Sequence, residues 1–216
     1  MNHPKRLRRP HPPRDLGGLH EDVIISVCPA LDMPAWVHGT FIADDASLHN
    51  PDHQHLFAAM DGDVGFLWAS GAYVKHGRQV HGQTEQLAFR AGGWQKMRME
   101  QQFMQWFGMH LPSFIITLDA GYCGQASDAE FCALVEHELY HIAQATNNEG
   151  MPAFHRDTGN PRLTLRGHDV EEFYGVVRRY GANPEVAELA RLAAQKPEVS
   201  RVSIASACGN CLKLVA

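Results

Sequence analysis

The sequence predicts a single α+β domain, on the basis of its length, its composition and the order of its predicted elements. A chain of 216 residues has room for one domain and a small additional module, but not for two full-sized domains. A composition that is 44% hydrophobic and 20% charged is typical of a globular protein and excludes a mostly disordered chain, a collagen-like repeat and a coiled coil. Strand-like stretches and helical periodicities both occur along the chain, as an α+β domain requires.

The charge and the histidine content narrow the classes of function. The formal net charge is −5 at pH 7 and the isoelectric point lies near 6.2, whereas a dedicated nucleic-acid binder usually carries a basic excess. The chain has 14 histidines, and imidazole side chains supply metal ligands and proton carriers near neutral pH. The first kind of functional site to expect is therefore a metal site.

The two ends of the chain differ in composition from the middle, which we predict to be a domain over residues 21–197. Residues 1–20 begin with a basic, proline-rich stretch that no apolar segment follows, so they predict a disordered tail rather than a secretory signal. A contact of this basic tail with nucleic acid stays an alternative. Residues 198–216 form a second predicted tail, in which Cys208 and Cys211 lack the two further ligands of a structural zinc site.

The cellular compartment is inferred from apolar runs and cysteines. No apolar run approaches the ~18–20 residues that a bilayer-spanning helix needs. The 5 cysteines are odd in number and do not suggest a disulfide framework in a chain of this length. We therefore expect a cytoplasmic protein without a membrane partner.

The predicted strands are short. Residues 22–28 are rich in β-branched side chains, residues 66–74 have a strand-like composition, and residues 83–89 could pair with the latter. Residues 29–63 are rich in Asp, His, Asn and Pro and predict a loop with short elements. The clearest strand covers residues 114–118, where large or β-branched side chains follow one another.

Apolar spacing predicts helices on both sides of that strand. A helix over residues 93–107 ends at Gly108, and its apolar side chains are expected to pack in the core: Trp94, Met97, Phe103, Met104 and Phe107. A polar loop over residues 151–166 precedes a helix over 169–180, and another helix runs from Asn183 to about Ala194.

The most legible helix begins at a capping box. Ser127 is followed three residues later by Glu130, so that each side chain can accept a hydrogen bond from the backbone N–H of the other. Asp128 complements the positive end of the helix dipole. The helix is expected over residues 128–145, before the chain becomes polar.

This helix contains an H-E-x-x-H motif, His137-Glu138-Leu139-Tyr140-His141. Residues four apart lie on one helix face, about one turn from each other, so the two imidazoles can bind a single Zn²⁺ ion. Glu138 then lies beside the metal, where it can take a proton from bound water. The motif predicts metal ligation by His137 and His141, with Glu138 as the catalytic general base.

A catalytic zinc ion normally has three protein ligands and an open position for water. Asn147 stands where the extended motif H-E-x-x-H-x-x-G-x-x-H has its third histidine, so the third ligand is expected further along the chain. His168 is the preferred candidate, at the first turn of the helix over 169–180. Glu171 and Glu172, three and four positions later, stay open as alternatives.

The histidines of the N-terminal half predict no second metal site. His53 and His55 lie in a segment rich in Pro, Asn and Asp, where exposed polar side chains are the commoner outcome. Asp61 and Asp63 lack the remaining oxygen ligands of an EF-hand calcium loop. The predicted metal centre therefore rests on the H-E-x-x-H helix and on His168.

The segments HELYH and HDVEEFYGVVRRYG resemble the putative phage metallopeptidase family and, more distantly, the SprT-like zinc peptidases. SprT-like peptidases place a third histidine in an H-G-x-x-F segment, and Asp169 stands here where that pattern has glycine. The resemblance covers about residues 64–181. It implies a compact zincin-like fold, with a small sheet packed on the active-site helix and zinc bound by His137, His141 and His168.

Together these observations predict a zinc peptidase that hydrolyses peptide bonds in a protein or peptide substrate. Zinc activates the water and polarises the scissile carbonyl, and Glu138 passes the proton to the leaving amine. We expect the strand over residues 114–118 to lie at the sheet edge and to bind the substrate backbone by β-augmentation. Two alternatives stay open: a non-catalytic, zinc-stabilised protein-binding module, and a SprT-like protease acting on DNA-bound proteins.

Overall fold

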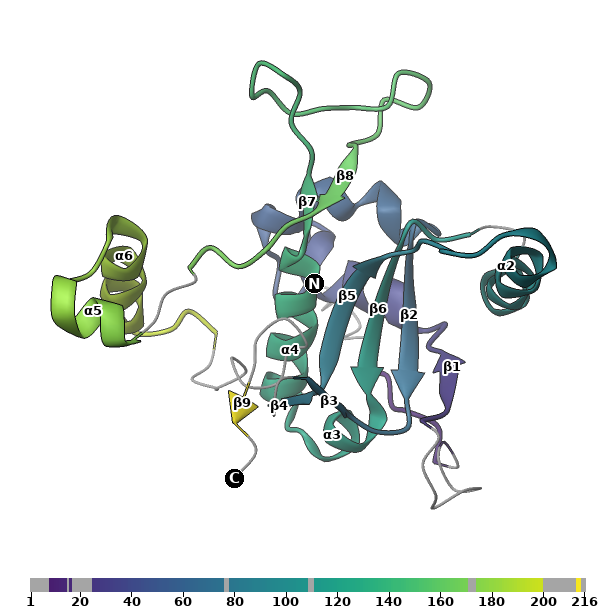
Figure 1. The fold of residues 1–216 in the computed structure, drawn as a ribbon, viewed down its shortest axis with the longest axis horizontal. Helices are drawn as coiled ribbons and strands as arrows, with labels where there is room; N and C mark the ends of the chain where they lie inside the picture. The colour runs from purple at the N-terminus through teal and green to yellow at the C-terminus, as the bar shows by residue number, and fades with distance from the viewer. Residues whose placement is uncertain are drawn as a thin grey trace, which may run out of the picture.

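The computed structural model of this chain describes the following residues: 8–14, 16, 25–75, 78–108, 111–170, 174–199 and 213–214. Glu171, Glu172, Cys208 and Cys211 lie outside the described residues. Within them, a small sheet is covered by helices, which confirms the predicted α+β class (Figure 1). None of the described helices combines the length and the hydropathy that crossing a bilayer requires.

A four-stranded sheet with the order β1-β2-β6-β5 forms the centre of the domain (Figure 1). β2 (Val64–Ala69) and β6 (Phe114–Asp119) pair in parallel. β1 (Val27–Pro29) pairs antiparallel with β2, and β5 (Gly82–Gln86) pairs antiparallel with β6. β2 is buried along its whole length, which explains its largely apolar sequence, because both faces of this strand are covered.

Two expectations about this sheet are wrong. The segment that contains β5 pairs with β6 rather than with residues 66–74, and β6 is an inner strand rather than the edge. The cause lies in the composition of β6, whose side chains are buried at every position but Thr117. An inner strand can bury such a run on both faces, whereas β5, with its polar residues, takes the edge position.

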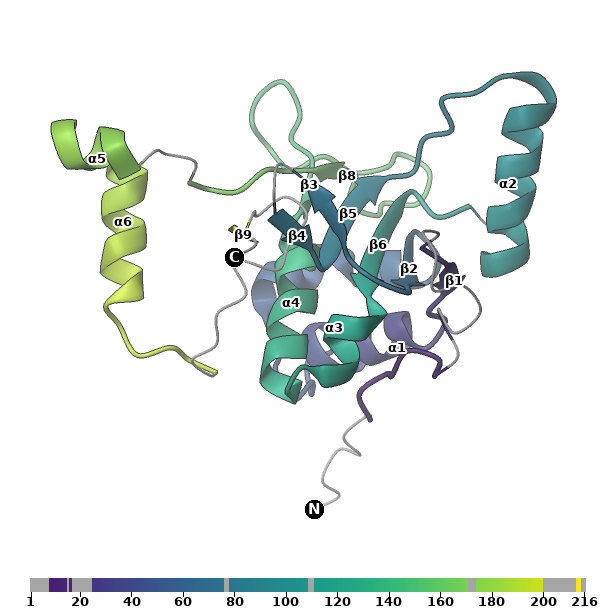
Figure 2. The ribbon, with the colours of Figure 1, turned by 60° about the horizontal axis from the view of Figure 1, so that its bottom comes forward.

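Helix α4 (Asp128–Tyr140) packs against β5, and the short helix α3 (Ala120–Gln125) connects it to β6 (Figure 2). Both hydrogen bonds of the predicted capping box are present, between Ser127 and Glu130. The helix ends five residues before the predicted end, because the chain turns into β7 (Ile142–Gln144). β7 pairs antiparallel with β8 (Leu163–Leu165), within the segment predicted to be a polar loop.

The predicted loop over residues 29–63 does contain short elements, and it also supplies much of the core. Trp36 lies 5.2 Å from Phe131 of α4, and Phe131 lies 6.3 Å from Trp68 of β2, measured between ring centroids. This cluster holds the segment and α4 on one face of the sheet. The elements are α1 (Met33–Val37), a π-helical turn (His38–Ile42) and two 3₁₀ turns (Pro51–Leu56 and Ala58–Met60).

Helix α2 (Gly93–Phe107) has the predicted bounds, and Gly108 ends it with a φ of 80°. The expectation that its apolar stripe packs in the core is wrong, because none of its residues is buried and Trp94 is 87% exposed. The helix stands to one side of the sheet in both views (Figures 1 and 2). Periodicity identifies an apolar helix face, but it does not say which surface that face contacts.

The C-terminal helices α5 (Tyr174–Tyr180) and α6 (Pro184–Ala193) lie on the other side of the domain (Figure 1). The described part of α5 begins later than the predicted helix over 169–180. α6 has the predicted bounds to within one residue, and the Asn183 side chain accepts a hydrogen bond from the Val186 N–H at its start. A second small sheet contains β3 (Tyr73–Lys75), β4 (Arg78–Val80) and β9 (Lys213–Leu214).

Part of the predicted N-terminal tail is described and contacts the start of α4. The Arg9 guanidinium lies 4.5 Å from the centroid of the Phe131 ring and donates to the backbone carbonyls of Cys123 and Ala126. It also lies 3.1 Å from the carboxylate of Asp128, which is itself exposed. Arg9 thus binds carbonyls at the end of α3 and contacts side chains in the first turn of α4.

Candidate metal centre

The two histidines of the H-E-x-x-H motif lie at the C-terminal end of α4. His137 is in the last turn and His141 is the C-cap residue. Their ring centroids are 5.2 Å apart, as expected for side chains one turn apart on one helix face. His141 is only 3% exposed, so the surrounding protein fixes the orientation of its side chain.

His168 joins this pair from a segment without regular secondary structure, not from the first turn of a helix. The β7–β8 hairpin pairs Ile142 with Leu165, and the next residue, Arg166, donates its backbone N–H to the His141 carbonyl at 2.9 Å. The chain is therefore attached to the end of α4 two residues before His168. The expectation that a helix delivers the third histidine is corrected: the register of a hairpin does so.

The three imidazoles converge on a common volume. One nitrogen of each of His137, His141 and His168 lies within 4.8 Å of the other two. The Nε2 atoms of His137 and His168 are 3.4 Å apart. With Zn–N distances of about 2.0–2.1 Å, two ligands of a tetrahedral zinc ion lie about 3.4 Å apart, so this separation fits a shared ion.

A second contact with Arg166 determines which nitrogen of His141 faces that volume. The His141 Nδ1 atom lies 2.9 Å from the Arg166 carbonyl oxygen. A carbonyl only accepts, so Nδ1 carries the proton and the lone pair belongs to Nε2. Metal-ligating histidines commonly donate their other ring N–H to a carbonyl in this way. The Arg166 Nη2 atom donates to both carboxylate oxygens of Asp169, at 2.9 and 3.0 Å. Asp169 therefore forms an ion pair with Arg166.

The Glu138 side chain extends from α4 toward the edge strand β5 and is fully buried. Its Oε2 atom accepts a hydrogen bond of 2.8 Å from the Thr84 hydroxyl of β5. A Cβ atom built on Gly82 of the same strand would lie 2.7 Å from Glu138 Oε1, so β5 approaches the carboxylate closely. Sequence reasoning missed Thr84 and Gly82, because these contacts depend on which strand packs against the helix.

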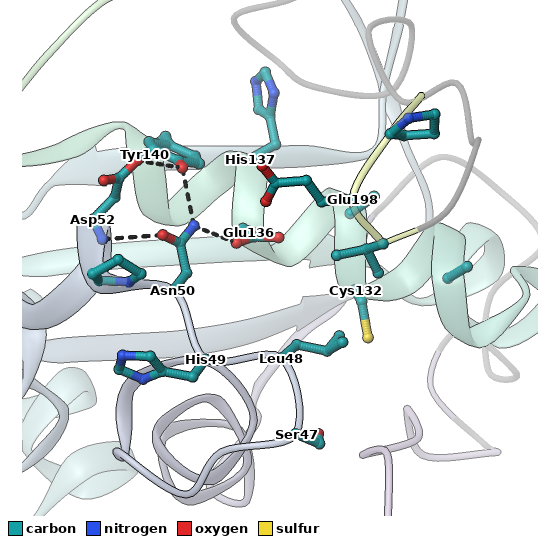
Figure 3. A pocket seen from close by; sticks show the side chains of 15 residues that line it. Ser47, Leu48, His49, Asn50, Asp52, Cys132, Glu136, His137, Tyr140 and Glu198 are labelled. Carbon is teal, nitrogen blue, oxygen red and sulfur yellow. Dashed lines mark hydrogen bonds between the residues drawn. The ribbon is translucent and has the colours of Figure 1, made fainter. Parts of the chain in front are cut away.

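A pocket of about 970 Å³ opens beside His137 (Figure 3). Asn50 donates to Glu136 at 2.7 Å and to the Tyr140 hydroxyl at 3.0 Å, and Tyr140 donates to Asp52 at 2.9 Å. Burial raises the pKa of Tyr140, and the nearby carboxylates of Asp52 and Glu136 add to this, against a lowering by Asn50. The neutral phenol therefore remains a hydrogen-bond donor across the physiological pH range.

The expectation that His53 is an exposed polar residue is wrong. Its side chain is fully buried, with its ring centroid 4.5 Å from that of Tyr140 and its Nε2 atom 3.6 Å from Glu136. His55 is partly buried, and its Nε2 atom lies 2.7 Å from the Ile142 carbonyl oxygen. Both histidines thus pack against the C-terminal end of α4 or the residues that follow it, an arrangement for which the local sequence carries no signal.

Comparisons with known proteins complete this description. Neither the curated proteins nor the solved structures give a match to the chain. A family model described as "Putative phage metallopeptidase" matches residues 34–194, a range that contains α4, the β7–β8 hairpin and the three histidines. Since the match spans most of the sequence, the resemblance to the putative phage metallopeptidase family is confirmed, and the chain belongs to this family.

Proposed function

We propose that this protein is a zinc-dependent peptidase in which His137, His141 and His168 bind the ion and Glu138 is the general base. The observation that carries the proposal is the convergence of three imidazole nitrogens within 4.8 Å of one another, at the end of the helix that holds a buried glutamate. Three protein ligands with one remaining position are typical of catalytic zinc sites, whereas structural sites are closed by four.

The choice of zinc follows from the ligand chemistry. Neutral imidazole suits zinc, and the proton of His141 on Nδ1 leaves Nε2 as the ligand atom. When bound, zinc acts as a Lewis acid and lowers the pKa of a bound water toward about 7. His141 is kept in the required tautomer by the Arg166 carbonyl, and this contact also fixes the plane of the ring.

Glu138 would move the proton in the reaction. Its carboxylate accepts the proton of the attacking water and then donates it to the leaving amine of the peptide. The Thr84 contact at Oε2 would hold the carboxylate in one orientation during this transfer.

The substrate would be a protein or peptide bound in extended form along β5. This strand is at the edge of the sheet and packs against α4, so a peptide paired with its outer edge would run past the end of the helix. Backbone pairing with an exposed edge strand is a common mode of peptide recognition. β5 therefore replaces the strand over residues 114–118 as the proposed site of β-augmentation.

Metal removal tests the proposed function. We expect the zinc-loaded protein to cleave fluorescein-labelled casein, 1,10-phenanthroline to stop the cleavage, and added Zn²⁺ to restore it. Stoichiometric zinc without cleavage would instead support a non-catalytic binding module. Cleavage that occurs only in the presence of DNA would support a protease acting on DNA-bound proteins.

A further inference from the structure

We infer that Thr84 is a positioning residue for the carboxylate of Glu138, and that Gly82 is required to leave space for that carboxylate. This inference rests on the proposed function of Glu138 as the general base. It adds two residues of the edge strand β5 to the catalytic arrangement, and neither belongs to a sequence motif.

The Thr84 hydroxyl contacts two oxygens of the same residue. Its Oγ1 atom lies 2.8 Å from Glu138 Oε2 and 2.9 Å from the Glu138 backbone carbonyl oxygen. Thr84 is itself 4% exposed, so water does not replace it readily. A hydroxyl has one proton to donate, and an ionised carboxylate is a stronger acceptor than a carbonyl. The contact therefore holds Oε2 against the strand whenever the carboxylate is ionised.

Gly82 faces the same carboxylate from the same strand. It lies two residues before Thr84, and residues two apart on a strand point to the same face of the sheet. A Cβ atom there would lie 2.7 Å from Glu138 Oε1 and 3.0 Å from Leu134 Cδ1. A methyl group at this position would displace the carboxylate, so the two residues together define where both of its oxygens lie.

This placement matters because a general base works only within hydrogen-bond reach of the proton that it accepts. A side chain as long as glutamate has several rotamers, and one of them must be maintained for efficient proton transfer. Thr84 restricts Oε2 and Gly82 allows the close approach, so that Oε1 keeps one position relative to the three histidines. A displacement of about 1 Å at such a group can cost ~10²-fold in rate.

The test uses the zinc-loaded full chain. Its substrate is a quenched fluorescent peptide that the wild-type protein cleaves, selected beforehand from a mixed peptide library. Thr84→Val removes the hydroxyl but keeps the shape, and we expect kcat to fall ~10²-fold with KM and zinc content unchanged. Thr84→Ser keeps the hydroxyl and should restore most of kcat. Thr117→Val is the matched control, since Thr117 pairs with Gln83 and so faces the other side of the sheet.

A second pair of variants tests the space at Gly82. We expect Gly82→Ala to lower kcat with zinc content unchanged, whereas Gly71→Ala should have no effect, because no atom lies within 4 Å of a Cβ atom there. Wild-type kcat in both Thr84→Val and Gly82→Ala would overturn the inference, as would a Thr84→Ser variant no better than Thr84→Val.

A readout that is independent of activity separates this inference from the proposed function. If the Thr84 hydroxyl binds the carboxylate, Thr84→Val and Glu138→Ala should lower the free energy of unfolding non-additively in urea denaturation. Additive effects would overturn the contact itself. If the effects are non-additive but the wild type cleaves no peptide of the library, the proposed function fails, and the positioning role fails with it.

Discussion

Replacing Glu138 with glutamine is expected to lower kcat by about 10²–10⁴-fold, the range that general acid–base catalysis contributes, while zinc binding is kept. Glutamine has nearly the same shape, so it can remain packed between α4 and Gly82 and can still accept from Thr84. Its amide does not take up a proton at neutral pH. Hydrolysis kinetics and zinc content per chain, determined by mass spectrometry, measure the two effects separately.

Glu149→Gln is the control for this substitution, because Glu149 is exposed in the loop between β7 and β8. It makes the same chemical change away from the site and should leave kcat unchanged. A Glu138→Gln variant with wild-type kcat would show that another group carries the proton. Loss of zinc together with activity would show instead that Glu138 acts through the metal site.

Replacing His168 with alanine is expected to weaken zinc binding by more than ~10²-fold. Loss of a residue that hydrogen-bonds to a metal-ligating side chain already costs about 10–100-fold in metal affinity. Loss of the ligating side chain itself should cost more. His137 and His141 would remain on α4, but two imidazoles do not complete the three-ligand set of a catalytic site. Competition titration against a chromophoric chelator measures the zinc dissociation constant.

His155→Ala is the matched control, since His155 is exposed in the loop between β7 and β8. The same titration on Glu171→Ala and Glu172→Ala addresses the alternatives that the sequence leaves open. Unchanged zinc affinity in His168→Ala, with a large loss in either glutamate variant, would move the third ligand to that glutamate.

Local patterns predicted those parts of the molecule that depend on neighbours in sequence. The capping box of Ser127 and Glu130, the bounds of α2 and the start of α6 all depend on interactions within one or two turns. The spacing of His137 and His141 is of the same kind, because the helix itself brings them to one face.

Long-range pairing determined what the sequence did not predict. His168 reaches the other histidines through the register between β7 and β8. β7 lies at the end of the segment predicted to be a helix, and β8 lies in the segment predicted to be a polar loop. Thr84 and Gly82 contact Glu138 because β5 is the strand that packs against α4. Strand order depends on how the whole sheet buries its apolar surface, and no short window of sequence contains that information.

X-ray absorption at the zinc edge measures whether three imidazoles and one further ligand surround the ion. For the zinc-loaded wild type, we expect three imidazole nitrogens at about 2.0–2.1 Å and one oxygen ligand, with no sulfur at about 2.3 Å. His168→Ala should lose one imidazole from this set. A sulfur ligand, or an imidazole count that His168→Ala leaves unchanged, would rule out the proposed three-histidine zinc site.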